Sequence, residues 1–305
     1  MSAVILLDGG MGRELARNGA PFRQPEWSAL ALIEGPAFVR KVHDAFIAAG
    51  ADVITTNSYA VVPFHLGEAR FRRDGKMLAD RAGRIAREAA DAAPRKVKVA
   101  GSLPPLFGSY RPDLFREEEA ASVAAVLVEG LAPHVDFWLA ETQGSIAEAA
   151  SLHAALAGDT RPLWVSFTLE DGEGAATAPR LRSQEPVADA VRAALGWQAE
   201  ALLFNCSQPE VMASALDAAR AALAGVPLTL GVYANAFPPQ GEDAEANVGL
   251  SPIRADLTPP HYLAFAEGWI GRGAGIVGGC CGIGPEHIHE IRTALDGMAI
   301  ARRPA

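Results

Sequence analysis

The three cysteines are the residues of this sequence whose type and position point most directly to chemistry. Cys206 ends an apolar run, and Cys280 and Cys281 are neighbours in the glycine-rich segment Gly278–Gly282. Their small, odd number argues against a framework of disulfide bonds, so they are either packing residues or metal ligands. Three thiolates around Zn²⁺ leave one tetrahedral position open, which is typical of a catalytic site. We therefore predict that Cys206, Cys280 and Cys281 bind Zn²⁺ and are the catalytic residues.

The open position predicts the kind of reaction. Soft thiolate ligands suit zinc and a sulfur substrate, and a thiol that enters the field of the metal is delivered as a thiolate. A free thiol has a pKa of about 8.5 and is mostly protonated at neutral pH. Alkyl transfer to sulfur is therefore the chemistry that this site favours. The adjacent cysteines require a sharp backbone turn, and we expect the glycines at 278, 279 and 282 to permit it through positive φ angles.

Short β-like runs alternate with longer helical stretches along the chain. The expected strands are Val4–Asp8, Asp52–Thr56, Val97–Gly101, Phe137–Glu141, Leu163–Thr168, Ala201–Asn205, Leu228–Tyr233 and Gly275–Gly278. The expected helices include Pro36–Ala49, Met77–Ala92, Glu117–Leu131, Ser145–Leu156, Pro186–Leu195, Pro209–Ala224 and Pro259–Ile270. This alternation predicts parallel strands joined by right-handed crossovers. Eight such units predict an α/β fold, a single (β/α)₈ TIM-type barrel, with a doubly wound open sheet as the alternative.

Two features favour the barrel over the open sheet. The segment Asp8-Gly-Gly-Met-Gly12 lacks the spacing of a nucleotide-binding fingerprint and has an acidic residue where a phosphate would lie. Polar residues also gather where the expected strands end, which is the edge at which barrels build active sites. In a closed barrel the ends of the sixth and eighth strands share one rim, so Cys206 can meet Cys280 and Cys281.

The composition is that of a globular protein and restricts its partners. Half of the 305 residues are apolar, 21% are charged, and the net charge is −9. An acidic chain without a basic run repels phosphate backbones, so we expect neither nucleic acid nor an anionic membrane as a partner. No apolar run suffices for a transmembrane helix or a signal peptide, so we expect a cytoplasmic protein. We expect one domain, residues 1–305, with Leu169–Gln184 and Phe237–Ser251 as long loops, and no pattern indicates an oligomeric state.

Six motifs, taken in order, resemble those of the homocysteine S-methyltransferase family. They are Asp8-Gly-Gly-Met-Gly12 with Glu14-Leu15, Thr55-Thr-Asn-Ser-Tyr59, Glu141-Thr142, Asn205-Cys206, Gly278-Gly-Cys-Cys-Gly282 and Pro285-Glu-His-Ile288. The ordered combination is specific, and it covers nearly the whole chain. The resemblance implies a (β/α)₈ barrel, zinc bound by the three cysteines, and methyl transfer to L-homocysteine to form L-methionine.

Homocysteine carries an ammonium and a carboxylate a few bonds from its sulfur, and the expected strand ends offer partners for both. We expect Glu141 and Asp8 to hold the ammonium. The alternatives are a salt bridge at the rim for Glu141 and a helix N-cap for Asp8. The N–H groups of Gly9, Gly10 and Met11, at the start of a short helix, are expected to receive the carboxylate.

Three further residues are expected to line the substrate pocket, namely Thr56, Asn57 and Asn235. For Thr56 and Asn57 a structural cap is an equally good interpretation. Asn235 matches the Tyr-Pro-Asn motif of the family only in part, because this chain has alanine at the middle position. His287 and His289 are interpreted as surface or packing residues, since the three cysteines and a substrate complete the zinc shell.

Some positions depart from the family pattern and bear on the substrates. Arg13 stands where many relatives carry a small hydroxyl residue, and Phe237-Pro-Pro-Gln240 replaces a stretch with glycine and glutamate. Thr142 follows Glu141 where betaine-using members tend to have an aromatic residue, and a quaternary ammonium favours an aromatic cage. We therefore expect a sulfonium donor, S-methylmethionine or S-adenosylmethionine. The alternatives are alkyl transfer to a different small thiol and a non-catalytic, zinc-stabilised binding barrel.

Overall fold

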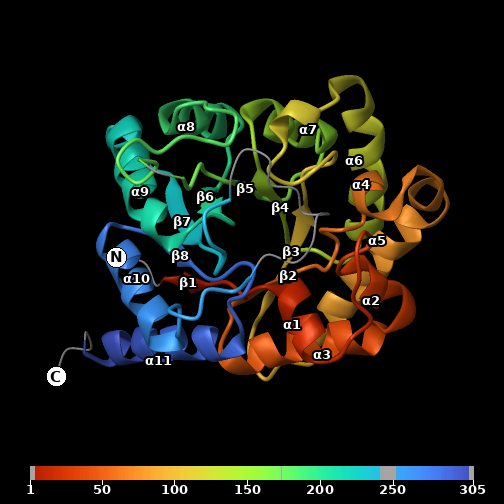
Figure 1. Cartoon of the computed structure of the whole chain (residues 1–305), viewed down its shortest axis with the longest axis horizontal. Coiled ribbons are helices and arrows are strands. Elements are labelled where there is room, and N and C mark those ends of the chain that lie inside the picture. The colour runs from red at the N-terminus through yellow and green to blue at the C-terminus, as the bar shows by residue number, and fades with distance from the viewer. Residues whose placement is uncertain (1–3, 173, 241–251, 302–305) are drawn as a thin grey trace.

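The computed structural model describes residues 4–172, 174–240 and 252–301. In these ranges the chain forms eight parallel strands inside a ring of helices (Figure 1). Hydrogen-bonded neighbours follow the order β1-β8-β7-β6-β5-β4-β3-β2. The strands are β1 (Ile5–Leu6), β2 (Val53–Thr55), β3 (Lys98–Leu103), β4 (Phe137–Gln143), β5 (Leu163–Phe167), β6 (Ala201–Asn205), β7 (Thr229–Tyr233) and β8 (Ile276–Val277).

The two ends of this order, β1 and β2, also meet. Leu7 pairs with Val53 in a parallel bridge, and the Asp8 N–H donates to the Val53 carbonyl over 3.1 Å. The Asp52 N–H donates to the Leu6 carbonyl over 2.7 Å. An open sheet would leave both edges unpaired, so these bonds rule out the doubly wound alternative. The predicted (β/α)₈ barrel is confirmed, and the bounds of each expected strand differ from the observed ones by at most two residues.

Helices cover the outside of the barrel (Figure 1). They are α1 (Met11–Arg17), α2 (Ala29–Glu34), α3 (Pro36–Ala49), α4 (Pro63–Leu66), α5 (Glu68–Asp91), α6 (Glu117–Leu131), α7 (Ile146–Ala155), α8 (Val187–Gly196), α9 (Pro209–Leu223), α10 (Pro259–Gly271), α11 (Pro285–Ala301) and a 3₁₀ turn, η1 (Pro112–Leu114). The helices α3 and α6 have the predicted bounds. The helix α5 begins at Glu68 rather than at the predicted Met77. The pattern missed its first turns because charged residues dominate them and Phe71 is the large apolar residue that marks the buried face there.

Side chains of each strand alternate between the inside of the barrel and the layer beneath the helices. Phe137 and Leu139 of β4 pack inside the barrel against Trp164 of β5, and the rings of Phe137 and Trp164 lie 4.2 Å apart between centroids. The intervening Trp138 belongs to the larger cluster that packs under the helices. The interior is thus a filled core, and a ligand must bind above it, at the rim.

The next inward position on five successive strands is polar. Each of these residues lies two positions beyond an apolar residue of the interior cluster. They are Thr55 on β2, Ser102 on β3, Glu141 on β4, Ser166 on β5 and Asn205 on β6. Hydrogen bonds join four of them in two pairs: the Ser102 hydroxyl donates to Glu141 Oε2 and the Ser166 hydroxyl donates to Asn205 Oδ1, both over 2.7 Å. The alternation of the strands therefore places a polar layer at their carboxyl ends, directly under the rim.

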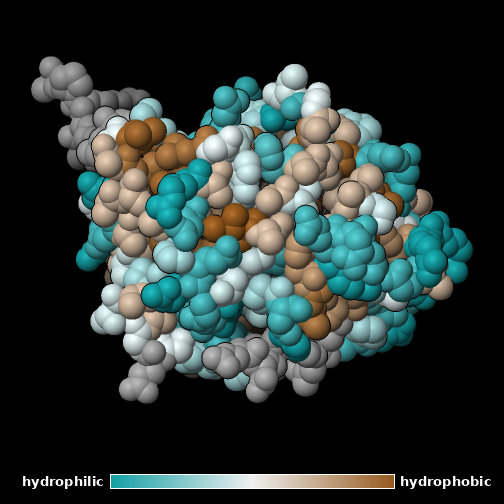
Figure 2. All heavy atoms as spheres, turned by 90° about the horizontal axis from the view of Figure 1, so that it is seen from above, coloured by the Kyte–Doolittle hydropathy of each residue, from teal (hydrophilic) through white to brown (hydrophobic). Residues whose placement is uncertain are grey.

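The outer surface and the long loops complete the fold. Hydrophilic and hydrophobic residues are interspersed over the side of the molecule shown in Figure 2. Among the helices that the structure describes, none is long and apolar enough to cross a membrane.

The predicted loop Leu169–Gln184 is present and is closed by a bridge between Leu169 and Leu181, with residue 173 outside the described ranges. Of the predicted loop Phe237–Ser251, residues 241–251 lie outside the described residues.

Candidate metal centre and acceptor pocket

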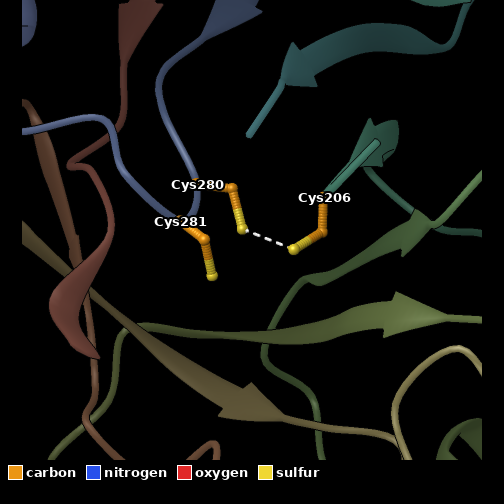
Figure 3. Close-up of side chains that lie close together, drawn as sticks. All are labelled: Cys206, Cys280 and Cys281. Atoms are coloured by element: carbon orange, nitrogen blue, oxygen red, sulfur yellow. Dashed lines mark hydrogen bonds between the residues drawn. The ribbon is translucent and has the colours of Figure 1, made fainter. Parts of the chain in front are cut away.

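Three sulfur atoms lie together at the rim of the barrel (Figure 3). Cys206 follows β6, whereas Cys280 and Cys281 follow β8, and all three thiols are free of disulfides. Their Sγ atoms lie within 4.8 Å of one another, and 3.0 Å separates Cys280 Sγ from Cys206 Sγ. Cys206 is buried, the other two are partly exposed, and all three line the same pocket. The convergence that the sequence predicts is therefore present.

The turn after β8 depends on glycine for two different reasons. Gly282 has a φ of +85°, in the left-handed region, as expected. Gly278 and Gly279 do not have positive φ angles, so that part of the prediction is wrong. A Cβ at Gly278 would lie 2.5 Å from Leu7 Cβ, and one at Gly279 would lie 2.2 Å from Ile283 Cγ2. These two positions need glycine for space, because the turn packs directly on neighbouring segments.

The cluster favours a thiolate at Cys206. The thiols of Cys280 and Cys281 donate to its sulfur, and 2.9 Å separates the Tyr110 hydroxyl from it; these hydrogen bonds lower the pKa of Cys206 well below its usual value. The same bonds to Cys206 raise the pKa of Cys280 and of Cys281, because each of these thiols donates its proton to a sulfur anion. Three convergent sulfur donors, one of them favoured as a thiolate, fit a thiophilic metal ion.

Two carboxyl groups face the same pocket, Asp8 after β1 and Glu141 on β4. Thr55 donates its N–H and its hydroxyl to Asp8 over 2.8 and 3.0 Å, and Ser102 donates to Glu141. Loss of water raises the pKa of Asp8 from 3.8 to about 8 and that of Glu141 from 4.5 to about 7, and repulsion from Glu141 adds to the shift of Asp8. A cation in the pocket would favour the charged form of both.

The alternative roles considered for these two acids do not describe them. The partners of Glu141 and Asp8 are hydroxyl and amide groups rather than the cation of a salt bridge. The N-cap of α1 is Gly10, so Asp8 does not cap this helix. Both side chains line the pocket and are held by short hydrogen bonds, and their binding of an ammonium stays a prediction.

The loop that follows β1 lies against the cysteine turn. A Cβ at Gly10 would be 2.6 Å from the Cys280 carbonyl oxygen, so only glycine fits there. The Gly10 N–H donates to the Ile283 carbonyl over 2.9 Å. That N–H is therefore already bonded within the protein, and the structure shows close packing against the cysteine turn at Gly10. Gly9, Gly10 and Met11 all line the pocket, and their part in carboxylate binding stays a prediction.

Thr56 and Asn57 line the pocket but also have partners within the protein. The Thr56 hydroxyl lies 2.9 Å from the Ser58 hydroxyl and accepts from the Ser102 N–H over 3.0 Å. The side-chain amide of Asn57 donates to the Ser28 carbonyl over 3.1 Å. These contacts match the structural interpretation of the two residues, and direct contact with a substrate stays a prediction.

Asn235 is fully buried and lies outside the residues that line the pocket. Its amide donates to the Cys206 carbonyl over 2.8 Å, and its Oδ1 accepts from the Phe237 N–H over 3.2 Å. Asn235 thus supports the backbone of Cys206, and this replaces the predicted contact with a substrate. The sequence could not distinguish the two roles, because both place an asparagine just after the seventh strand.

Five aromatic side chains line the pocket although the sequence analysis did not predict them as site residues: Trp27, Tyr59, Tyr110, Tyr233 and Phe237. Tyr59, Tyr233 and Phe237 lie at or near strand ends, and that position was a usable signal. Trp27 and Tyr110 lie far along the loops after β1 and β3. No periodic pattern marks such positions, so only the folded loops bring them to the rim.

The two departures from the family pattern touch each other. The guanidinium carbon of Arg13 lies 5.4 Å from the centre of the Phe237 ring, in a cation–π contact. Arg13 is not among the residues that line the pocket, whereas Phe237 is. His287 is buried, with Nδ1 accepting from the Gly284 N–H and Nε2 donating to the Leu257 carbonyl. It is a packing residue, as predicted, and His289 is exposed.

Comparison with known proteins agrees with this geometry. The family model described as homocysteine S-methyltransferase matches residues 5–295. Homocysteine S-methyltransferase of Escherichia coli K12 is 29% identical, covering 95% of this chain and 94% of its own, and selenocysteine methyltransferase of Astragalus bisulcatus is 25% identical, covering 95% and 92%. The metallated form of the E. coli homocysteine methyltransferase MmuM superposes with a TM-score of 0.76 at 29% identity, covering 96% of both chains. The chain therefore belongs to the homocysteine S-methyltransferase family.

Proposed function

We propose that this enzyme moves a methyl group from a sulfonium donor, S-methylmethionine or S-adenosylmethionine, to L-homocysteine, with Zn²⁺ as its cofactor, and so forms L-methionine. The observation that carries the proposal is the placement of three convergent thiols and two buried carboxyl groups around one pocket. Homocysteine is a molecule with a thiol at one end and an ammonium at the other, and family membership agrees with it as the acceptor.

Cys206, Cys280 and Cys281 are the residues that would hold the zinc ion. Their sulfur atoms are soft donors, and three of them leave one tetrahedral position for a substrate. A bound zinc ion would lower the pKa of the acceptor thiol, so that the sulfur attacks as a thiolate at neutral pH. The proton of the thiol passes to solvent.

The protein orients the acceptor through its amino-acid end. Asp8 and Glu141 share the ammonium, and its positive charge compensates the cost of ionising two carboxyl groups in a pocket with little water. The N–H groups of Gly9 and Met11 receive the carboxylate. With this end held, the sulfur is directed toward the cysteine cluster, which converts a bimolecular encounter into an oriented attack.

The transfer balances without an acid catalyst. The acceptor sulfur forms a bond to the methyl carbon while the bond from that carbon to the donor sulfonium breaks, and the donor leaves as a neutral thioether. The aromatic side chains of the pocket offer faces to the donor cation and exclude water. Because those faces also suit a quaternary ammonium, betaine belongs among the donors to be compared.

The proposal is tested by measuring bound zinc and then assaying methionine formation from homocysteine with each donor. We expect one zinc ion per chain and activity with a sulfonium. Cys281→Ser is expected to lose both the metal and the activity. A zinc-free active enzyme, or a fully active Cys281→Ser variant, would refute the ligand assignment. Zinc without methionine from any donor would favour a different thiol acceptor or the non-catalytic barrel.

A different small thiol or selenol is the second candidate acceptor. It is favoured by the contact of Arg13 with Phe237, because both positions depart from the family pattern and Phe237 lines the pocket. One relative bears the name selenocysteine methyltransferase. The same assay with cysteine and selenocysteine separates the candidates, since the true acceptor has the highest kcat/KM.

The remaining expectations form part of the same proposal. One barrel contains every described strand and helix, which supports a single domain over residues 1–305. Three free thiols require a reducing compartment, which supports a location in the cytoplasm. The partners in this proposal are the acceptor and the methyl donor, with neither nucleic acid nor membrane.

A further inference from the structure

Two residues at the rim hold a backbone conformation that side chains with a Cβ rarely adopt. Thr142 has a φ of +59° and Cys206 has a φ of +54°. For a β-branched residue such as threonine this region is unfavourable, so the surrounding structure must hold it in place. Thr142 directly follows Glu141, in a stretch of β4 where the register with β5 shifts between Ala140 and Gln143. Such a bulge re-aims the side chains near it.

One buried amide bonds to the first of these residues and immediately precedes the second. Asn205 Oδ1 accepts from the Thr142 N–H over 3.1 Å, and Asn205 Nδ2 donates to the Thr142 hydroxyl over 2.7 Å. The Ser166 hydroxyl of β5 donates to the same Oδ1 over 2.7 Å. Asn205 is completely buried and is not among the residues that line the pocket. It therefore ties β4 to β6 across β5 without touching the cavity.

The residues next to this amide are those at the two ends of the acceptor site. Glu141 is joined through the backbone to Thr142, and Cys206 is joined to Asn205. We propose that Asn205 is a positioning residue that sets the separation between the Glu141 carboxylate and the Cys206 sulfur, and thereby the chain length of the amino-thiol acceptor. This inference rests on the proposed function, in which Glu141 holds the ammonium and Cys206 lies beside the reacting sulfur.

The consequence concerns selectivity rather than overall activity. Homocysteine and cysteine differ by one methylene between the ammonium-bearing carbon and the sulfur. A fixed separation discriminates against the shorter molecule, and one methylene is worth about 10- to 200-fold in kcat/KM. When the amide clamp is lost, the ends of β4 and β6 are no longer held at one separation, so the shorter acceptor is rejected less strongly and the ratio of kcat/KM for homocysteine to that for cysteine should fall at least tenfold.

The test compares variants at both ends of the clamp. Asn205→Ala removes all three bonds, whereas Thr142→Val keeps the shape of the side chain and removes only its hydroxyl. Thr142→Ser restores that hydroxyl. Ser207→Ala is the matched control, because Ser207 is a fully buried hydroxyl at the same strand end that bonds to the backbone of Leu169 and of Asn205 but not to the side-chain amide of Asn205. The measurements are kcat/KM and calorimetric Kd for homocysteine and for cysteine, together with bound zinc and melting temperature.

We expect the homocysteine-to-cysteine ratio, in both kcat/KM and Kd, to fall at least tenfold in Asn205→Ala and to fall in Thr142→Val. It should be kept in Thr142→Ser and in Ser207→Ala, whatever their melting temperatures. An unchanged ratio in a folded, zinc-containing Thr142→Val variant would overturn the inference, and so the test does not depend on the folding of Asn205→Ala. If the wild-type enzyme and both clamp variants select homocysteine over cysteine equally, the inference about Asn205 is wrong and the proposed function stands. A wild-type enzyme that does not bind homocysteine overturns the proposed function as well.

Discussion

Replacing Glu141 by glutamine tests the reasoning about the acceptor pocket most directly. The substitution keeps the size of the side chain and can keep the hydrogen bond from Ser102, but it removes the charge that the acceptor ammonium needs. L-Norvaline is the suitable ligand, because it has a methyl group where homocysteine has its thiol. Its binding therefore reports the amino-acid end without any contribution from metal or sulfur ionisation.

The magnitude follows from the position of the carboxyl group. Removing one partner of a desolvated charge pair costs about 2–5 kcal/mol. At pH 7 the Glu141 carboxyl, with its pKa raised to about 7 by burial, is half protonated, and completing its ionisation costs about 0.4 kcal/mol. The net loss of about 1.6–4.6 kcal/mol corresponds to a Kd for norvaline that is about 14- to 2,000-fold higher.

The pH dependence supplies an independent sign. An ammonium binds the ionised carboxyl, and the ionised fraction of a group with a pKa of about 7 rises about tenfold between pH 6 and pH 8. Norvaline should therefore bind the wild-type enzyme more tightly as the pH rises over this range. In Glu141→Gln the increase of norvaline affinity with pH should be smaller and should occur at lower pH, because the charge that helps to raise the pKa of Asp8 is gone.

Calorimetric titration of norvaline at pH 6, 7 and 8 measures both quantities. Glu148→Gln is the matched control, since Glu148 is also a buried glutamate whose pKa burial raises to about 7, but it bonds to the Gly144 and Ser145 N–H groups outside the pocket. It should lower the melting temperature and leave norvaline affinity within about threefold. A Glu141→Gln enzyme that binds norvaline as tightly as the wild type would refute the assignment of the ammonium site.

Three further outcomes follow from buried groups and from the cysteine turn. The metal-free protein should lose stability, measured by melting temperature, as the pH rises from 6 to 8. Asp8, Glu141 and Glu148 have raised pKa values, so their contribution to the free energy of unfolding is complete at acidic pH and is lost as they ionise through pH 7–8. A flat or rising profile of melting temperature against pH would contradict this. His43 is fully buried, neither ring nitrogen has a partner among the described residues, and burial lowers its pKa from 6.5 to about 3. His43→Leu should therefore stabilise the fold by about 2 kcal/mol more at pH 5 than at pH 7.5. An equal gain in stability at both pH values would show that the burial of charge is not the cause. Gly282→Ala should lower the free energy of unfolding by about 1–2 kcal/mol, because this position has a φ of +85°, and should weaken zinc retention against a chelator. Gly268→Ala, with nothing near its Cβ, should do neither. Equal behaviour of the two variants would refute the argument about the turn.

Much of the fold was readable because it depends on periodicity. Eight apolar runs separated by helical stretches predict eight parallel strands, and the observed strands agree within two residues. The start of α5 was missed because its first turns are mostly charged. The apolar face of the helix is visible in the sequence only when Phe71 and Leu78, seven residues apart, are read as one buried face. The closure between β1 and β2 needed the structure, since a single bridge from Leu7 to Val53 leaves no mark in the composition.

The candidate site divides in the same way. The three cysteines and the acids Asp8 and Glu141 were identified from residue type and from their position at strand ends, because any parallel barrel brings those ends to one rim. Asn235 was given a substrate contact, but it lies outside the pocket lining and bonds to the Cys206 carbonyl, and Gly10 lines the pocket but also packs tightly on the cysteine turn. A strand end fixes where a residue lies, but not which neighbour its side chain reaches.

The sequence by itself thus determined the set of chemical groups and the edge of the fold at which they meet. Only the tertiary structure decided their spacing and state: the 3.0 Å between two sulfur atoms, the clamp of Asn205 on Thr142, and the aromatic walls from distant loops. The physical reason is that residue type and strand register are local properties. Burial, hydrogen-bond partners and the pKa values that depend on them arise from segments that are far apart along the chain.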